Sequence, residues 1–302
     1  MSAIITDQLR IVNSSNFVAG VASTSNSYYV WIGLPNATEF DEDWNETPPA
    51  PKDSFSEETD YWDTMIALKR INAADVTRVV RKLDWTSGTT YEMYRNDYSR
   101  SNVSPVTSST NLYDANYYVM NSDYRVYACL QNGTDPENPD GRPSLDQPLF
   151  TDLEPRSAGG SGDGYIWKYL FTIKPSELIK FDSTSFIPVP NNWETLTDVA
   201  AVRNNAATSG QLKIVTIKNR GVGYGTATTY NNVPIKGDGE GATCSVVVNA
   251  AGKINSVEVT NGGSNYSFGS VDLNAVGLTN PSGSTDAAFN VIIPPQGGHG
   301  AD

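Results

Sequence analysis

Histidine and cysteine, on which much catalysis and metal binding depend, are nearly absent from this chain. The single histidine, His299, lies in the segment PPQGGHGAD near the C-terminus, which is typical of a flexible tail. The two cysteines, Cys129 and Cys244, stand far apart in strand-like runs, where we expect buried thiols. We therefore predict no catalytic Ser-His-Asp or Cys-His site, no metal site, no cofactor and no disulfide framework.

Basic residues and long apolar runs are also scarce. The chain has 21 Lys and Arg against 34 Asp and Glu, which gives a net charge of -13 and a pI near 4.5. A surface of this charge repels phosphate groups, so we expect neither nucleic acid nor an anionic membrane as a partner. No stretch approaches the roughly eighteen apolar residues that span a bilayer, and no signal-peptide pattern is visible at the start. We expect assembly in the cytoplasm.

What the chain does have is β-branched and aromatic residues punctuated by Gly, Pro and Asn, a composition that favours strands and turns. We predict a mainly β fold, with short helices between the strands and a small Gly-rich β domain at the C-terminus. Predicted strands are a buried one at 28–34, a partly alternating one at 75–85, a hairpin at 117–131, a strand at 164–173 and an extended segment at 186–190.

Two helices are predicted in the N-terminal part. The first covers 6–21, with Leu9, Val12, Phe17 and Val21 roughly on one face. The second begins at a cap on Ser54 or Ser56 and ends near Arg70, with Tyr61, Met65 and Leu68 as its buried stripe. Acidic residues in its first turn and basic residues in its last turn complement the helix dipole.

An internal repeat marks the C-terminal part. Residues 215–224 (VTIKNRGVGY) match residues 257–266 (VEVTNGGSNY), and each copy is later followed by a strand, at 243–249 and 288–293. Two such units can bury one face each against the other. We predict four parts: a β domain at 1–200, a linker at 201–211, a Gly-rich repeat domain at 212–295 and a flexible tail at 296–302.

Four polar segments are candidates for chemistry, and each has a plainer interpretation. In the acidic loop 40–53, the carboxylates of Asp41, Glu42, Asp43 and Glu46 cluster around Trp44, which suits a sugar-binding platform or a solvated surface loop. Residues 237–241 (GDGEG) and 221–225 (GVGYG) lack the helix that a phosphate loop needs, so we interpret both as turns. Residues 135–140 (DPENPD) have carboxylates suited to a hard cation, but a polar loop is the preferred interpretation. We assign no catalytic residue and no small-molecule substrate.

Aromatic side chains are the best candidates for protein contacts. Rigid interfaces are rich in Tyr and Trp. The candidate interface residues are Trp44, Tyr91, Tyr94, Tyr98 and Tyr113. Core packing accounts for most tyrosines, so we expect only the exposed members of this group to act as anchors.

The run GDGYIWKYLFTIKP at 162–175 is the most distinctive motif of the chain. It resembles the gene-eight baseplate wedge subunits of T4-like phages, in which a Gly-Asp-Gly-Tyr-x-Trp-x-Tyr-Leu-Phe-x-Ile run precedes a proline. Two shorter segments, RKLDW at 81–85 and DYWDTM at 60–65, resemble other parts of that family in the same order. The motif positions are Arg81, Lys82, Asp84, Trp85, Gly162, Asp163, Gly164, Tyr165, Trp167, Tyr169 and Phe171.

This resemblance covers roughly residues 1–195 and implies a structural role without catalysis. It implies a β-sandwich core, a homodimer, contacts to other baseplate wedge subunits, and a place in the tail baseplate of the virion. The Gly-rich repeat departs from the family and resembles small β modules of other phage structural proteins. Two alternatives stay open: a tail-associated module that binds glycan through Trp44 and the Gly-rich domain, and a glycan hydrolase or lyase that uses carboxylates alone.

Overall fold

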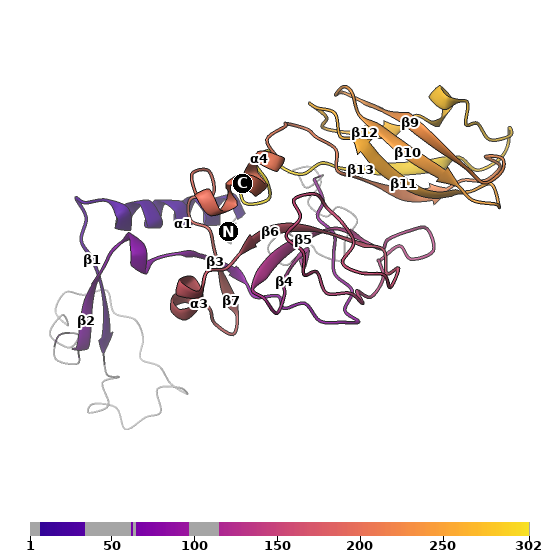
Figure 1. The fold of residues 1–302 in the computed structure, drawn as a ribbon. Helices are drawn as coiled ribbons and strands as arrows, with labels where there is room; N and C mark the ends of the chain where they lie inside the picture. Colours follow the sequence, from indigo (N-terminus) through magenta and orange to yellow (C-terminus); the bar gives the residue numbers. More distant parts are fainter. Residues whose placement is uncertain (1–6, 34–61, 63–64, 97–114, 302) are drawn as a thin grey trace, which may run out of the picture. The chain divides into compact units, whose positions relative to one another are not determined.

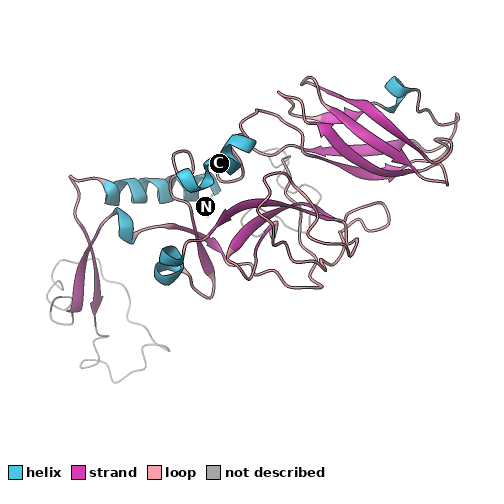
Figure 2. Cartoon of the chain, in the orientation of Figure 1, coloured by secondary structure: helices cyan, strands magenta, loops and turns pink. Residues whose placement is uncertain are grey.

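The computed structural model describes residues 7–33, 62, 65–96 and 115–301 (Figure 1). Over these residues the chain is mainly β, with short helices between antiparallel sheets, as predicted (Figure 2). It divides into two compact units, Met1–Arg78 and Val79–Asp302.

The described part of the first unit contains helix α1 (Asp7–Ala22) and a two-stranded ribbon. Helix α1 confirms the first predicted helix, and β1 (Tyr28–Gly33) confirms the strand that follows it. Strand β1 pairs antiparallel with β2 (Met65–Ile71), after which η2 (Ala73–Asp75) forms one 3-10 turn. The expectation that the strand at 28–34 is buried is wrong, because five of the six residues of β1 are exposed.

The second predicted helix is wrong at its C-terminal end, although Trp62 within the predicted range is helical. Residues Met65–Ile71 form strand β2, and the caps expected at Ser54 or Ser56 lie outside the described residues. The segment MIALKRI contains good helix formers, but the backbone register with β1 (Trp31 opposite Leu68) supplies partners that the local sequence does not reveal. Pairing with a distant strand overrides the local preference.

The first part of the second unit contains a three-stranded and a two-stranded sheet. Strands β4 (Tyr118–Met120), β5 (Arg125–Asn132) and β6 (Tyr165–Thr172) form one sheet in that order, and β3 (Arg78–Arg81) pairs with β7 (Phe186–Val189). Helix α3 (Pro175–Phe181) lies between β6 and β7 in the chain. The predicted hairpin, the strand at 164–173 and the extended segment at 186–190 are confirmed, whereas of 75–85 only β3 is a strand.

Aromatic packing fills the core of this part. Trp167 is fully buried and stacks on Tyr165 with ring centroids 5.3 Å apart, while Tyr91 meets Trp167 edge-on at 5.8 Å. Tyr127 and the thiol of Cys129 lie in the same core, and burial raises the pKa of that thiol. Cys129 and Cys244, which lies farther along the chain, are both free and buried.

The segment expected to be a linker is partly helical. Turn η3 (Thr197–Val199) leads into helix α4 (Ala200–Asn205), and Val199 and Val202 pack with Trp193 in a small core of their own. Only the residues after α4 lack regular structure up to β8. The sequence missed this helix because its apolar positions are few and small.

The expected flexible tail is packed against the same small core. The indole of Trp193 donates to the carbonyl oxygen of Gly297 at 2.6 Å, and the Gly297 amide donates to Ala206. The imidazole of His299 meets the ring of Tyr94 edge-on at 4.5 Å. Glycine permits this close approach, since a Cβ on Gly300 would lie 2.4 Å from the Trp193 ring.

The Gly-rich part forms two sheets around a separate core. Strands β8 (Ile214–Arg220) and β13 (Ala287–Ile292) pair in one sheet. The other has the order β11 (Ile254–Asn261), β10 (Thr243–Val248), β9 (Thr228–Gly237) and β12 (Gly269–Val271). Turn η4 (Leu273–Val276) follows β12, and buried apolar residues from both sheets share one cluster.

The two repeat copies exchange strands. The first strand of copy one (β8) pairs with the last strand of copy two (β13), and the first strand of copy two (β11) pairs with the last strand of copy one (β10). The hydroxyl of Tyr224 accepts from the Ala287 amide at 2.8 Å, and that of Tyr266 accepts from the Ala242 amide at 3.2 Å. Each sheet thus contains paired strands from both copies. The sequence predicts only that the two copies pack one face against the other.

Candidate assembly surfaces

The first unit exposes an unusual number of large apolar side chains. Each of them is 38–62% exposed. They are Leu9, Ile11, Val12 and Phe17 on α1, Tyr28, Tyr29, Val30, Trp31 and Ile32 on β1, and Ile66 and Leu68 on β2. We call this set the helix–ribbon surface. Phe17 and Tyr28 join its two parts through an edge-on ring contact at 6.1 Å.

Both faces of the ribbon are apolar and exposed. Successive strand residues point to opposite faces, so Tyr29 and Trp31 lie on one face and Val30 and Ile32 on the other. A two-stranded ribbon by itself is marginally stable in water. Exposed apolar patches of this kind mark interaction sites in soluble proteins. The ribbon therefore has the character of an element that is completed by a partner.

The size of the helix–ribbon surface fits a protein interface. A half-exposed side chain of this kind presents on the order of 100 Å². The eleven residues together offer on the order of 1,000 Å², against about 800 Å² per partner in a standard interface. The sequence did not indicate this surface, because β1 has the apolar composition of a buried strand.

The aromatic residues predicted as interface anchors lie elsewhere. Tyr91 is buried in the core, where its hydroxyl accepts from the Thr86 amide at 2.7 Å, so it is not an exposed anchor. Tyr94 is half-buried between Tyr117 and His299. The other three, Trp44, Tyr98 and Tyr113, lie outside the described residues.

The long motif at 162–171 holds the core together. Asp163 accepts from the amides of Leu145 and Tyr165 at 2.8 and 3.0 Å, and this fixes the loop before β6. Gly162 and Gly164 have positive φ angles, of 72° and 83°. Later in the motif, Tyr165 and Trp167 are buried in the core, and Tyr169 and Phe171 are partly buried against it.

The shorter motif at 81–85 also makes contacts within the chain. The ammonium group of Lys82 pairs with Asp182 at 3.1 Å, and the indole of Trp85 donates to Ser144 at 3.0 Å. Arg81 donates to the carbonyl oxygen of Ala115 at 3.3 Å, while Asp84 forms a backbone bridge with Met120. These contacts indicate a structural role for the motif.

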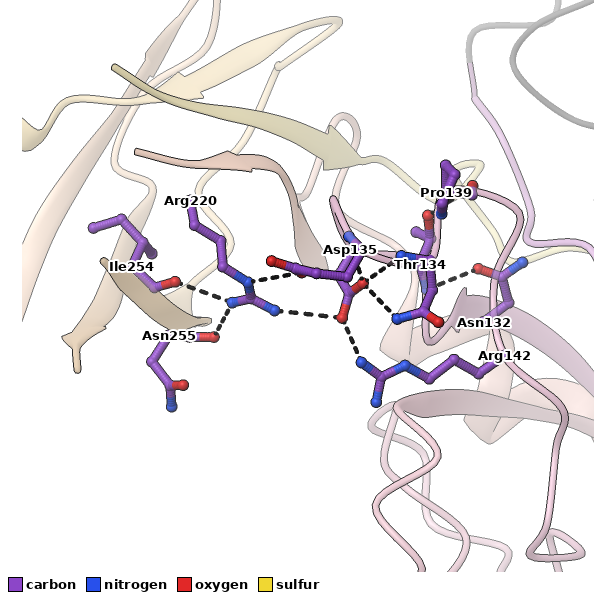
Figure 3. Close-up of polar contacts among 10 residues, drawn as sticks. Asn132, Thr134, Asp135, Pro139, Arg142, Arg220, Ile254 and Asn255 are labelled. Atoms are coloured by element: carbon purple, nitrogen blue, oxygen red, sulfur yellow. Dashed lines mark hydrogen bonds and ion pairs between the residues drawn. The ribbon is translucent and has the colours of Figure 1, made fainter. Parts of the chain in front are cut away.

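A charged cluster joins the loop after β5 to the Gly-rich part (Figure 3). The Arg220 guanidinium contacts Asp135 at 3.4 Å and Glu137 at 3.2 Å, and it donates to the carbonyl oxygens of Ile254 and Asn255. Arg142 pairs with the same Asp135 carboxylate at 2.6 Å. We call this set the Arg220 clasp.

Electrostatics hold the central carboxylate of the clasp in its charged form. Burial pushes the pKa of Asp135 upward, but hydrogen bonds from Asn138 and the charges of Arg142 and Arg220 outweigh it, so the pKa is lowered. These contacts occupy the carboxylate that a cation would need. One sign of the clasp is present in the sequence: Arg220 breaks the repeat, because the second copy has Gly262 at the matching position.

Comparison with known proteins fits these observations. The family model described as "Bacteriophage T4, Gp8" matches residues 3–154, which is half of the chain. The chain belongs to this family. The Gp8 match includes the helix–ribbon unit, the 81–85 motif and the hairpin, and the resemblance stated for the sequence is confirmed. The long motif at 162–171 and the repeat lie beyond the matched residues.

One curated relative is the "Baseplate wedge protein gp8" of Enterobacteria phage T4. It is 24% identical over 211 residues, covering 62% of this Gp8-family chain and 60% of the relative. The chain thus spans about 60% of the length of the curated relative it matches. Among the described residues, no group of His, Cys, Asp or Glu is arranged to hold a metal ion, and no helix is long and apolar enough to cross a membrane.

Proposed function

We propose that this chain is a structural, non-enzymatic subunit of the baseplate wedge of a contractile phage tail. Membership of the Gp8 family and the name of the T4 relative support this assignment. The observation that carries it is the helix–ribbon surface, an exposed apolar unit with the size of an interface. Its place is the tail baseplate of the virion, and its assembly takes place in the host cytoplasm.

The partners we propose are a second copy of the chain and other wedge subunits. A two-stranded ribbon has two open edges and two apolar faces, so two copies related by a two-fold axis can cover each other. The remaining surface is acidic overall and is left for neighbouring wedge proteins. No small molecule, nucleic acid or membrane takes part in this function.

The test is a charge placed on the helix–ribbon surface. Ile32 is 62% exposed on β1, so Ile32→Glu leaves the fold intact but puts a carboxylate into the proposed interface. The matched control is Ile179→Glu, which puts the same change on α3 at a residue 88% exposed. We expect dimers for the wild type and the control, and monomers for Ile32→Glu, in size-exclusion chromatography with light scattering.

Two outcomes contradict the proposal. Dimers that persist unchanged in Ile32→Glu would place self-association on another surface. A wild-type chain that stays monomeric and joins no co-expressed wedge protein would remove the assembly function itself.

A further inference from the structure

Three polar side chains from distant parts of the second unit meet beside the small Trp193 core. They are Lys168 on β6, Asn205 at the end of α4 and Glu154 in the loop before β6. The Lys168 amine lies 2.5 Å from Oδ1 of Asn205, and Nδ2 of Asn205 donates to Glu154 at 2.6 Å. The carboxamide of Asn205 thus contacts the amine on one side and the carboxylate on the other.

Lys168 has the environment of a nucleophile. The residue is only 4% exposed, in a strand whose neighbouring positions face an aromatic core. Burial, together with the nearby charge of Lys213, lowers its pKa to about 8. About a tenth of the amine is therefore neutral at pH 7 and about half at pH 8, and a neutral amine can attack a carbonyl carbon.

Asn205 and Glu154 have the positions of an electrophile and a proton carrier. The contact of the Lys168 amine with Oδ1 brings the nitrogen close to the carboxamide carbon. Glu154 is bonded to the amide nitrogen that has to leave, and hydrogen bonds from Asn205 and Lys213 hold the pKa of Glu154 low against the effect of burial. Its side chain is exposed, which gives a released molecule a path to solvent.

We propose that Lys168 and Asn205 join in an intramolecular isopeptide bond, with Glu154 as the catalytic carboxylate. The neutral Lys168 nitrogen attacks Cγ of Asn205, which forms the Nζ–Cγ bond and places negative charge on Oδ1. Glu154 takes one proton from Nζ and delivers it to Nδ2. The Cγ–Nδ2 bond then breaks, the carbonyl re-forms and ammonia leaves. An amine and a carboxamide become a secondary amide and ammonia, without oxidant or cofactor.

The cross-link ties β6 to α4 across 37 residues of chain. It closes a covalent loop that contains β7 and the Trp193 core, just before the chain enters the Gly-rich part. A link of this kind restricts the unfolded chain and resists pulling forces, because the loop cannot be drawn out.

The experiment is intact-mass spectrometry of the purified full-length chain after incubation at about pH 8, where much of the Lys168 amine is neutral. We expect a mass lower by one ammonia and a proteolytic fragment in which the peptides of Lys168 and Asn205 are joined. Glu154→Gln, a change at an exposed side chain, is expected to keep the unreacted mass, as are Lys168→Met and Asn205→Ala. Asn204→Ala is the matched control and is expected to react like the wild type.

Two results overturn the proposal. One is a wild-type chain that keeps the full sequence mass after prolonged incubation. The other is loss of ammonia that persists in Lys168→Met or occurs without a joined fragment, because the Asn-Gly pairs at 132–133 and 261–262 can also release ammonia by cyclising. Circular dichroism of Glu154→Gln verifies that its unreacted state belongs to a folded chain.

Discussion

The Arg220 clasp makes a quantitative prediction about how the Gly-rich part is held. The substitution Arg220→Met keeps the length of the side chain but removes the guanidinium. It deletes the contacts with Asp135 and Glu137 and leaves the carbonyl oxygens of Ile254 and Asn255 without this donor. The substitution therefore removes contacts to the loop after β5 and contacts to the start of β11 (Figure 3).

The magnitude follows from burial. Removing one member of a fully buried pair costs about 3–5 kcal/mol, and an exposed pair contributes about 0–1 kcal/mol. The Arg220 side chain is 22% exposed and that of Asp135 10%, which places the clasp between these limits. Arg142 still pairs with Asp135 at 2.6 Å in the variant, so the carboxylate keeps one partner. We expect Arg220→Met to lower the free energy of unfolding by about 2 kcal/mol.

Urea denaturation followed by tryptophan fluorescence measures this loss. The matched control is Arg156→Met, whose ion pair with Asp152 is about half exposed on both sides and is expected to matter by less than about 0.5 kcal/mol. A double-mutant cycle with Asp135→Asn is expected to give a coupling energy of about 1 kcal/mol. If Arg220→Met is no more destabilising than Arg156→Met, the clasp contributes no stability and the reasoning from burial fails.

Three further predictions concern the repeat, the long motif and the tail. Tyr266→Phe leaves two buried backbone groups without a partner and is expected to cost about 2–4 kcal/mol, against about 1–2 kcal/mol for Tyr224→Phe, in chemical denaturation. Gly164→Ala is expected to lower the melting temperature more than Gly162→Ala, because its Cβ would lie 2.8 Å from the backbone of Gly133 whereas Gly162 has open space. Burial and the charge of Lys168 lower the pKa of His299 to about 3, so between about pH 6.5 and pH 3 the unfolded chain binds a proton that the folded chain does not. Stability is therefore lost as the pH falls from about 6.5, by up to about 1.4 kcal/mol per pH unit, and His299→Gln is expected to flatten this dependence in urea titrations.

Each of these has a result that speaks against it. Equal losses for the two tyrosine variants would mean that the second hydrogen bond of Tyr266 contributes nothing. Equal melting temperatures for the two glycine variants would show that the loop before β6 relaxes around a methyl group. A pH profile of His299→Gln that follows the wild type would assign the acid sensitivity to other groups.

Much of the local structure was determined by the sequence by itself. The 3.6-residue spacing of apolar residues indicated α1, and the runs of β-branched and aromatic residues indicated β1, β5 and β6. The near-absence of histidine and the long motif indicated a structural protein of the Gp8 family before any geometry was known. The repeat also predicted two equivalent turns, and in these turns Gly221 and Gly263 have nearly the same positive φ angle, 60° and 59°.

Only the tertiary structure decided which strands pair and which surfaces stay exposed. The segment MIALKRI became β2 through pairing with β1, and the apolar β1 remained exposed because nothing in the described chain covers it. The exchange of strands between the repeat copies, the Arg220 clasp and the packing of the tail on Trp193 all join residues far apart in the chain. A local pattern records the preference of a segment, whereas these contacts depend on which distant segment meets it in the folded chain.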